Sequence, residues 1–432
     1  MSDDSVISDG PKPTLFRRLA PGILIAATGV GAGDLISATL AGSKPGIGTT
    51  ILWAALAGAL LKWVANEGLA RWQMATGTTL LEGWVRRLSW PVQWIFLVYL
   101  FVWSFWVGGV LAGACGVAAT GFLPLSEDLR QSKIIWGVIH SLLGLVLVWL
   151  GGYRLFEKLM AVCIAIMFVT VMATVVMLPG GDWSGIATGL VTPRIPDHPQ
   201  GIARVLSVLG GVGGTVTLLS YGYWIREEGR SGWQGVRQCR LDLTVGYTMT
   251  ALFGVAMIII GSRVALAGEG AKMAIILAEQ VELAAGPAGR WIFLTGFWGA
   301  VFSSLLGVWQ SVPYLFADFL EIRRGMPASQ RRQVDFTGTW AYRGFLIAIA
   351  VGPLVTLWQS IDAIQMIYAV LGAAFFPFLA LTLLIMNNRE AWVGKQFRSG
   401  WLTNLLLFAT LAFFLYAGYL HLCDQVNSWL AK

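Results

Sequence analysis

The sequence predicts an all-α membrane protein whose chain crosses the bilayer eleven times. Of the 432 residues, 56% are hydrophobic and only 12% are charged, whereas a soluble domain usually has about 25% charged residues. The apolar residues are gathered in runs of about 20, the length that spans a bilayer as a helix. The runs lie near residues 20–42, 48–70, 91–122, 134–152, 156–179, 203–226, 241–266, 291–319, 340–359, 363–386 and 401–420.

The basic residues predict how the chain is oriented. With residues 1–19 as a cytoplasmic tail, most of the 30 Lys and Arg residues fall on the cytoplasmic side of the spans, as the positive-inside rule requires. This predicts a multi-pass protein of the cell membrane with its C-terminus outside. The net charge of +7 is explained by these loops, so it does not indicate binding to nucleic acid, and lipids are the expected surroundings.

The chain divides into two halves of five spans. Residues 180–202, PGGDWSGIATGLVTPRIPDHPQG, are rich in Pro and Gly and predict an extracytoplasmic loop between repeats at 20–179 and 203–386, with an eleventh helix and the C-terminus in 387–432. The segment 271–287 is too short and too charged to span, and predicts an amphipathic surface helix.

Each half begins with a span that is interrupted by glycines. The first reads GVGAGD at 29–34 and the sixth reads GVGGTV at 211–216. Glycine weakens a helix interior by about 1 kcal/mol relative to alanine, and interrupted spans at corresponding positions are typical of inverted-repeat transporters. The alternative is that these glycines only allow close helix packing.

Asp34 is the main candidate for a cargo-binding residue. It follows the first glycine cluster directly, and acids inside a membrane normally face a cavity or a partner. The carbonyl of Gly31 beside it would complete the carboxylate-and-carbonyl set that hard cations prefer. The alternative role is to cap the second half of the helix, which is compatible with binding.

The sixth span offers further oxygen ligands. Thr217, Ser220 and Tyr221 follow its glycine cluster at helical spacing, and the carbonyl of Gly214 lies just before them. The alternative for each hydroxyl is an ordinary interhelical hydrogen bond.

Three further polar residues lie within the spans. His140 is a candidate for proton transfer because its pKa is near neutral, and a packed, hydrogen-bonded histidine is the alternative. Lys62 and Glu67 lie near the inner end of the second span, where we expect both to extend toward the cytoplasm; Glu67 is also a candidate gating residue. The third span has no Asp, Glu, His, Lys or Arg, which predicts weak or absent proton coupling.

The sequence resembles the Nramp family of divalent-metal transporters. The resemblance is carried by residues 20–42 with WAALAGALLKWVANEGLARWQMATGTT at 53–79, by GGVGGTVTLLSYGYW at 210–224 and by AAFFPFLALTLLIMNN at 373–388. It implies a LeuT-type fold with a 5+5 inverted repeat, discontinuous helices 1 and 6, and metal held at the two breaks.

Several family motifs are altered in this chain. The metal-binding aspartate of helix 1 falls on Gly31 and the asparagine of that motif on Asp34, while Met-Pro-His of helix 6 becomes Thr217, Leu218 and Leu219. The family's helix 3 acids fall on Trp106 and Gly109, and its helix 10 glutamine falls on Phe375. The chain is thus similar to a divergent branch such as the Nramp-related magnesium transporters, which also lack the methionine.

Taken together, the sequence predicts a transporter of a divalent cation by alternating access, with Mg²⁺ or Mn²⁺ as cargo. No enzyme signature and no resident cofactor is expected. The alternatives are an organic cation or amine as cargo, bound against Trp106, Tyr221 and Phe375, or a receptor or scaffold that does not transport. The sequence leaves the oligomeric state open, and a monomer is compatible with it.

Overall fold

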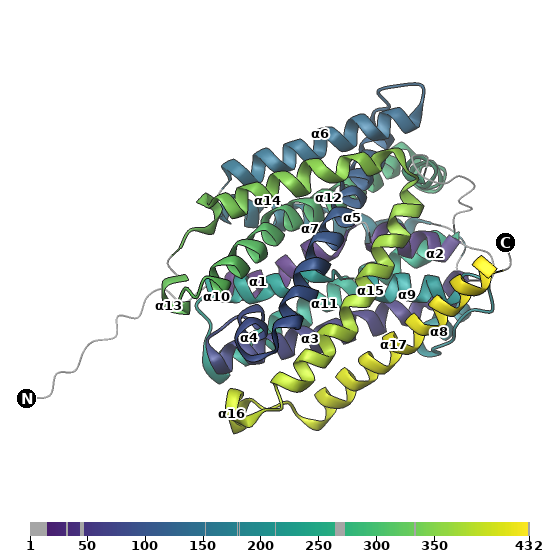
Figure 1. Ribbon diagram of the computed structural model, residues 1–432. Coiled ribbons are helices and arrows are strands. Elements are labelled where there is room, and N and C mark those ends of the chain that lie inside the picture. Colours follow the sequence, from purple (N-terminus) through teal and green to yellow (C-terminus); the bar gives the residue numbers. More distant parts are fainter. Residues whose placement is uncertain are drawn as a thin grey trace, which may run out of the picture.

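The computed structural model describes residues 15–31, 33–43, 47–151, 153–178, 180, 182–211, 213–263, 273–331 and 334–430. Within these ranges the ordered elements are all helical, and they form one bundle of long helices (Figure 1). Short helices lie at the two ends of the bundle, with α4, α13 and α16 at one end and α8 at the other.

The first span is interrupted at its glycines, as predicted. Helix α1 (Leu15–Gly29) ends at the cluster, and a π-helical segment (Gly33–Ala38) leads into α2 (Thr39–Ser43). The last helical bond of α1 runs from the amide of Val30 to the carbonyl of Ala26 at 2.7 Å, so the carbonyls that follow are free of the helix.

The sixth span is interrupted in the same way. Helix α9 (Gly201–Gly211) ends at the second glycine cluster, and the chain resumes with a 3₁₀ turn (Val216–Leu219) and α10 (Ser220–Glu227). Gly213 and Gly214 have φ values of 82° and 78°, a region that favours glycine over other residues. This explains why the break falls at these positions.

Nine further elements cross the bundle, so that the described residues contain the eleven crossings predicted. Ten of the eleven have the length and hydropathy of a membrane span, and the first is represented by the shorter apolar helix Leu19–Gly29. The nine are α3 (Leu52–Thr76), α5 (Trp90–Phe122), α6 (Leu129–Leu150), α7 (Tyr153–Met177), α11 (Gly232–Arg263), α12 (Met273–Arg323), α14 (Trp340–Val351) with a 3₁₀ turn (Gly352–Trp358), α15 (Ile361–Met386) and α17 (Trp401–Leu430).

The connecting segments hold more helix than the sequence indicated. Helix α8 (Trp183–Val191) lies within the Pro- and Gly-rich segment 180–202, capped by Asp182, and α4 (Leu80–Arg87) follows α3. Two one-turn helices, α13 (Ala328–Arg331) and α16 (Glu390–Val393), lie in later loops. The segment expected to be a surface helix is the first part of α12, set off by non-helical backbone at Gly286.

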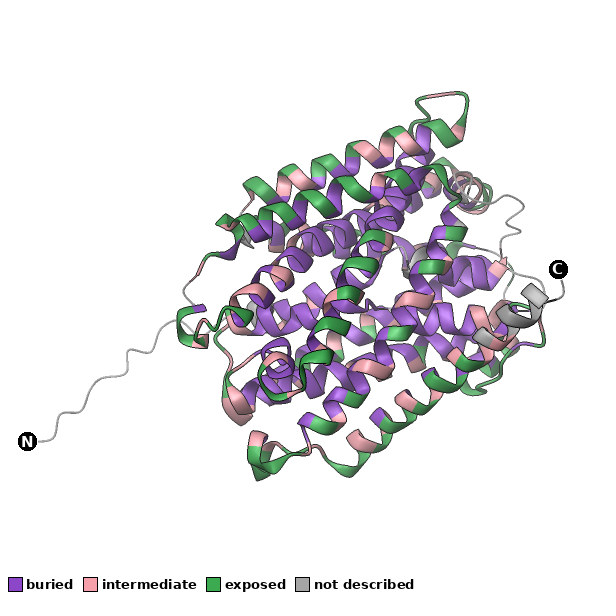
Figure 2. Ribbon diagram, in the orientation of Figure 1, coloured by how far each residue is buried: buried purple, intermediate pink, exposed green. Residues whose placement is uncertain are grey.

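Burial follows the place of each helix in the bundle (Figure 2). The first interrupted span is packed against α11 and α12, the α9 part of the sixth span is packed against α15, α3 and the π-helical segment, and most described residues of α9 and α10 are buried. Exposed apolar side chains lie mainly on α5, α6, α7, α14 and α17, the surface that lipid would cover.

Candidate functional site

A small cavity lies where the two interrupted spans meet. Its volume is about 10 Å³, which is close to the space that one water molecule needs. Gly29 and Gly31 line it from the first break, and Gly214 and Thr217 line it from the second. The remaining wall comes from α5, α12, α15 and Thr28 of α1.

The carbonyl groups released at the first break are held by α12. The hydroxyl of Ser304 lies 3.0 Å from the carbonyl oxygens of both Thr28 and Val30, and 3.5 Å from that of Ala27. Ser303 donates to the carbonyl of Ala27 at 3.1 Å. These serines therefore replace the intrahelical hydrogen bonds that α1 loses where it ends.

Close approach explains why glycine is needed at the break. A Cβ on Gly29 would lie 2.7 Å from the backbone carbon of Gly213, and one on Gly31 would lie 2.1 Å from Ser304 Oγ. The two breaks are thus in direct backbone contact, which only glycine allows.

The predicted binding residues are only partly brought together. Gly31, Gly214 and Thr217 line the cavity, whereas Ser220 lines a larger neighbouring cavity. The Tyr221 hydroxyl instead donates to Asp242 of α11 at 2.6 Å. The chain over Val216–Leu219 is a 3₁₀ turn and becomes α-helical at Ser220.

Two further predictions concern the side chain of Asp34 and the aromatic wall of the cavity. The side chain of Asp34 lies outside the described residues, although its backbone belongs to the π-helical segment. The aromatic wall expected from Trp106 and Phe375 is not at the cavity. Trp103 and Tyr368 line it, while Phe375 stacks on Tyr99 at 5.4 Å.

The cavity also contains residues that sequence reasoning missed. Thr28 precedes the first glycine cluster, and its hydroxyl is buried without a hydrogen-bond partner in the part of the chain that the structure describes. An unpaired buried hydroxyl costs about 1–3 kcal/mol, so an ion or a water in the cavity would stabilise it. Its position next to the glycines was the available signal. Nothing in the sequence indicated that Trp103 and Tyr368 line the cavity; only the fold places them there.

Lys62 does not extend toward the cytoplasm, so that prediction was wrong. Its side chain is fully buried and its ammonium donates to the carbonyl of Gly210 at 3.1 Å, over the ring of Phe376. Gly210 is in the last turn of α9, where the free carbonyls and the helix dipole attract a cation. The interruption of the sixth span explains the difference, because a continuous helix would offer no such carbonyl.

Glu67 also stays inside the protein, contrary to the prediction. It is 2% exposed, and its carboxylate binds Arg71 at 2.5 Å and Arg240 of α11 at 2.7 Å. Two arginines compensate the charge that burial would otherwise make costly. This arrangement ties α3 to α11.

His140 is packed between two tryptophans. Its Nδ1 lies 2.8 Å from the carbonyl oxygen of Trp136, and its Nε2 accepts from the indole of Trp298 at 2.9 Å. An indole nitrogen can only donate, so the ring is neutral with its proton on Nδ1. Both ring nitrogens are occupied in this state.

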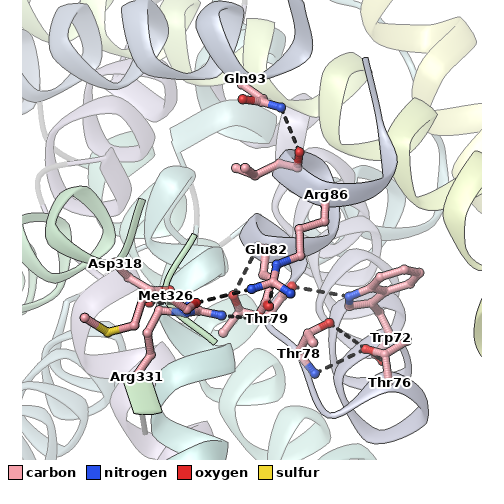
Figure 3. Close-up of polar contacts among 11 residues, drawn as sticks. Trp72, Thr76, Thr78, Thr79, Glu82, Arg86, Gln93, Asp318, Met326 and Arg331 are labelled. Atoms are coloured by element: carbon pink, nitrogen blue, oxygen red, sulfur yellow. Dashed lines mark hydrogen bonds and ion pairs between the residues drawn. The ribbon is translucent and has the colours of Figure 1, made fainter. Parts of the chain in front are cut away.

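A buried ionic cluster closes the end of the bundle that carries α4 and α13 (Figure 3). Arg331 of α13 binds both Glu82 of α4 and Asp318 of α12, the latter at 2.7 Å. The hydroxyl of Tyr223 on α10 donates to the other oxygen of Asp318 at 2.7 Å. We call these four residues the end cluster; it joins the sixth span to α4 and α12. Sequence reasoning missed Asp318, although an acid within the eighth span was itself a signal.

Two interrupted helices around an ion-sized, oxygen-lined cavity define the class of protein, an integral membrane transporter. The model of the family described as natural resistance-associated macrophage protein-like (Nramp) matches residues 22–424, and the chain belongs to this family. Nramp proteins are transporters and not enzymes, as the sequence predicted.

Individual relatives agree with this assignment. The chain is 23% identical over 402 residues to an uncharacterised protein of Pasteurella multocida, covering 87% of this chain and 86% of that one. It is 26% identical over 201 residues to the divalent metal cation transporter MntH of Granulibacter bethesdensis, covering 46% and 42% of the two chains. A solved manganese transporter of Eremococcus coleocola superposes with a TM-score of 0.72 at 16% identity, over 100% of this chain and 92% of that one. The LeuT-type fold predicted from the sequence is thereby confirmed.

Proposed function

We propose that this chain moves a divalent metal cation across the cell membrane by alternating access, with the cargo as substrate and not as a cofactor. The observation that carries the proposal is the ion-sized cavity at the two helix breaks. Its lining offers hydroxyl and backbone oxygens, which favour hard cations such as Mg²⁺ or Mn²⁺ over soft ones. Family membership points the same way.

Asp34 is the carboxylate that we assign to this site, with Gly31, Gly214 and Thr217 as neighbours. The described residues contain no cluster of three His, Cys, Asp or Glu side chains, so a single carboxylate carries most of the negative charge. Ser220 and Tyr221 belong to a second set of contacts, one turn further along α10. For Glu67 we favour a structural role in the contact between α3 and α11 over gating.

We further propose that transport is weakly coupled or uncoupled to protons. The described part of α5 carries no acid or histidine, and both ring nitrogens of His140 are engaged. A relay of acidic and histidine side chains therefore has no groups on this face of the bundle.

The domain organisation and orientation complete the proposal. Residues 20–179 and 203–386 are the two repeats, joined by 180–202 and followed by 387–432. Residues 1–19 face the cytoplasm and the C-terminus faces outward, which agrees with the distribution of Lys and Arg.

Uptake into proteoliposomes tests the proposal. We expect the full-length protein to take up Mn²⁺ or Mg²⁺ without acidifying the lumen, and Asp34→Ala to abolish this uptake, because the cargo loses its carboxylate. The matched control is Glu127→Ala, an exposed acid in the loop after α5, which should retain uptake.

Four results would contradict the proposal. Undiminished uptake by Asp34→Ala would exclude the assigned site, and strict proton co-movement would exclude weak coupling. Uptake of an amine but of no metal would favour the organic-cation alternative, and no flux of any cargo would favour the receptor or scaffold.

A further inference from the structure

A second, much larger cavity lies beside the ion-sized one. It has a volume of about 440 Å³ and is bounded by the ends of α6 and α7, by α10, by α12 and by the loop that precedes α14. Ser220 lines it one helical turn beyond Thr217 of the small cavity. This volume lies within the range of sites for small organic molecules, about 300–1,000 Å³.

A group of aromatic side chains forms one part of the cavity wall. Tyr223 and Tyr314 make an edge-to-face contact with ring centroids 4.9 Å apart, and Tyr314 makes a second one with Phe336 at 5.0 Å. Trp224 and Tyr342 extend the same wall. Faces of such rings attract cations, and their apolar area binds flat organic groups.

The charged residues of this cavity are of one sign. Glu227 at the end of α10 and Asp335 in the loop before α14 are both exposed, so they lie at its opening. Among the described residues no Lys, Arg or His lines it. Arg226 is close by, with its guanidinium 5.1 Å from the Tyr223 ring centroid, but it lines a different cavity.

The deeper wall contains polar atoms that lack partners. The hydroxyls of Ser220 and Ser311 and the amide oxygen of Gln310 are buried, and none of them has a hydrogen-bond partner among the described residues. Ser220 and Ser311 are 1% and 3% exposed. Groups of this kind recover stabilisation when a bound molecule pairs with them.

We propose that this cavity is a binding site for a small organic cation, an amine on a flat apolar body. The ammonium lies between the carboxylates of Glu227 and Asp335, the body packs on the tyrosine and phenylalanine rings, and polar substituents reach Gln310 and the two serines. A bare metal ion would gain little from a wall that is mainly apolar. This site is separate from the one assigned to the cargo.

Equilibrium binding to the full-length protein in detergent, without divalent metal, tests the site. The probe is tryptamine, a flat aromatic amine that is cationic at pH 7, and its neutral comparison is tryptophol, which carries a hydroxyl in place of the ammonium. We expect tryptamine to bind about tenfold more tightly than tryptophol, and the double variant Glu227→Gln with Asp335→Asn to remove this preference.

The matched control is Glu279→Gln, an exposed acid in the first part of α12, which should leave binding unchanged. Equal affinity for the two probes in the unsubstituted protein would overturn the proposal. An unchanged preference in the double variant would do so too, and if the double variant fails to fold, each single substitution is read in the same way. Since no metal is present, the outcome is independent of whether the chain transports one.

Discussion

Lys62 places an ammonium group beside the proposed cation site. A Cβ on Gly213 would lie 3.4 Å from its side chain, and Gly214 next in the chain lines the cavity. A charge of this kind repels a divalent cation, yet it also satisfies the Gly210 carbonyl. Affinity for cargo and stability of the break are therefore opposed at this residue.

Substituting Lys62 with Met should separate the two effects. Met fills a similar volume without the charge, so we expect a lower KM for Mn²⁺ uptake together with a loss of about 1–3 kcal/mol in stability, because the Gly210 carbonyl loses its donor. Uptake kinetics and thermal unfolding measure the two. Lys158→Met, at an exposed position of α7, is the control, and an unchanged or higher KM would contradict the argument.

At the scale of elements, the glycines of the first break predict a rescue experiment. Gly31→Ala should impair uptake, because its methyl group would overlap with Ser304, whose Oγ and Cβ are 2.1 and 2.5 Å away. Adding Ser304→Gly should restore part of the uptake, since the obstacle is that side chain and Ser303 still donates to the carbonyl of Ala27. Gly29→Ala, which meets the backbone of Gly213, should not be rescued by Ser304→Gly.

The experiment depends on measuring all four variants in the same liposomes. Two results would contradict the argument: Ser304→Gly fails to improve uptake by Gly31→Ala, or it improves uptake by Gly29→Ala as well. Either result would show that the two substitutions do not act through these separate close contacts. Folding of each variant is checked beforehand by size-exclusion chromatography.

The end cluster makes a second prediction about elements. Arg331 is 1% exposed and binds two buried carboxylates, so Arg331→Gln should lower stability by about 3–5 kcal/mol. The exposed arginine of the pair Arg324 with Glu321 provides a control, since Arg324→Gln should cost at most about 1 kcal/mol. Thermal unfolding in detergent compares them, and equal losses would show that burial of the cluster has no stabilising role.

The sequence predicted elements better than contacts between them. Hydropathy located the eleven crossings, and the glycine clusters located both interruptions, because these signals are local. The place of Lys62 was missed because the acceptor, Gly210, is far away in the chain and becomes free only when the sixth helix breaks. The three carbonyl acceptors of Ser304 could not be predicted, because they depend on where α1 ends.

For the molecule as a whole, the distribution of helix ends predicts which loops share a side of the membrane. Gly338 lies near the end cluster in the loop after α12, the eighth crossing, whereas Glu127 lies in the loop after α5, the third crossing. An odd number of crossings separates the two loops, so they lie on opposite sides of the membrane. With a cytoplasmic N-terminus, an impermeant maleimide should label Glu127→Cys in intact cells and Gly338→Cys only after the membrane is opened. Both positions accept a side chain, as Gly338 has no atom within 4 Å of a Cβ. The reverse pattern would invert the proposed orientation.

The position of Ser304 has a consequence for how the first span moves. Its single hydroxyl proton lies within reach of three carbonyl acceptors at the end of α1, those of Ala27, Thr28 and Val30. When α1 slides along α12, the proton passes from one acceptor to the next and the number of hydrogen bonds is conserved. We therefore expect a displacement of α1 by about one residue, 1.5 Å of rise, to cost little hydrogen-bonding free energy. This would make it easier for the first span to move during alternating access.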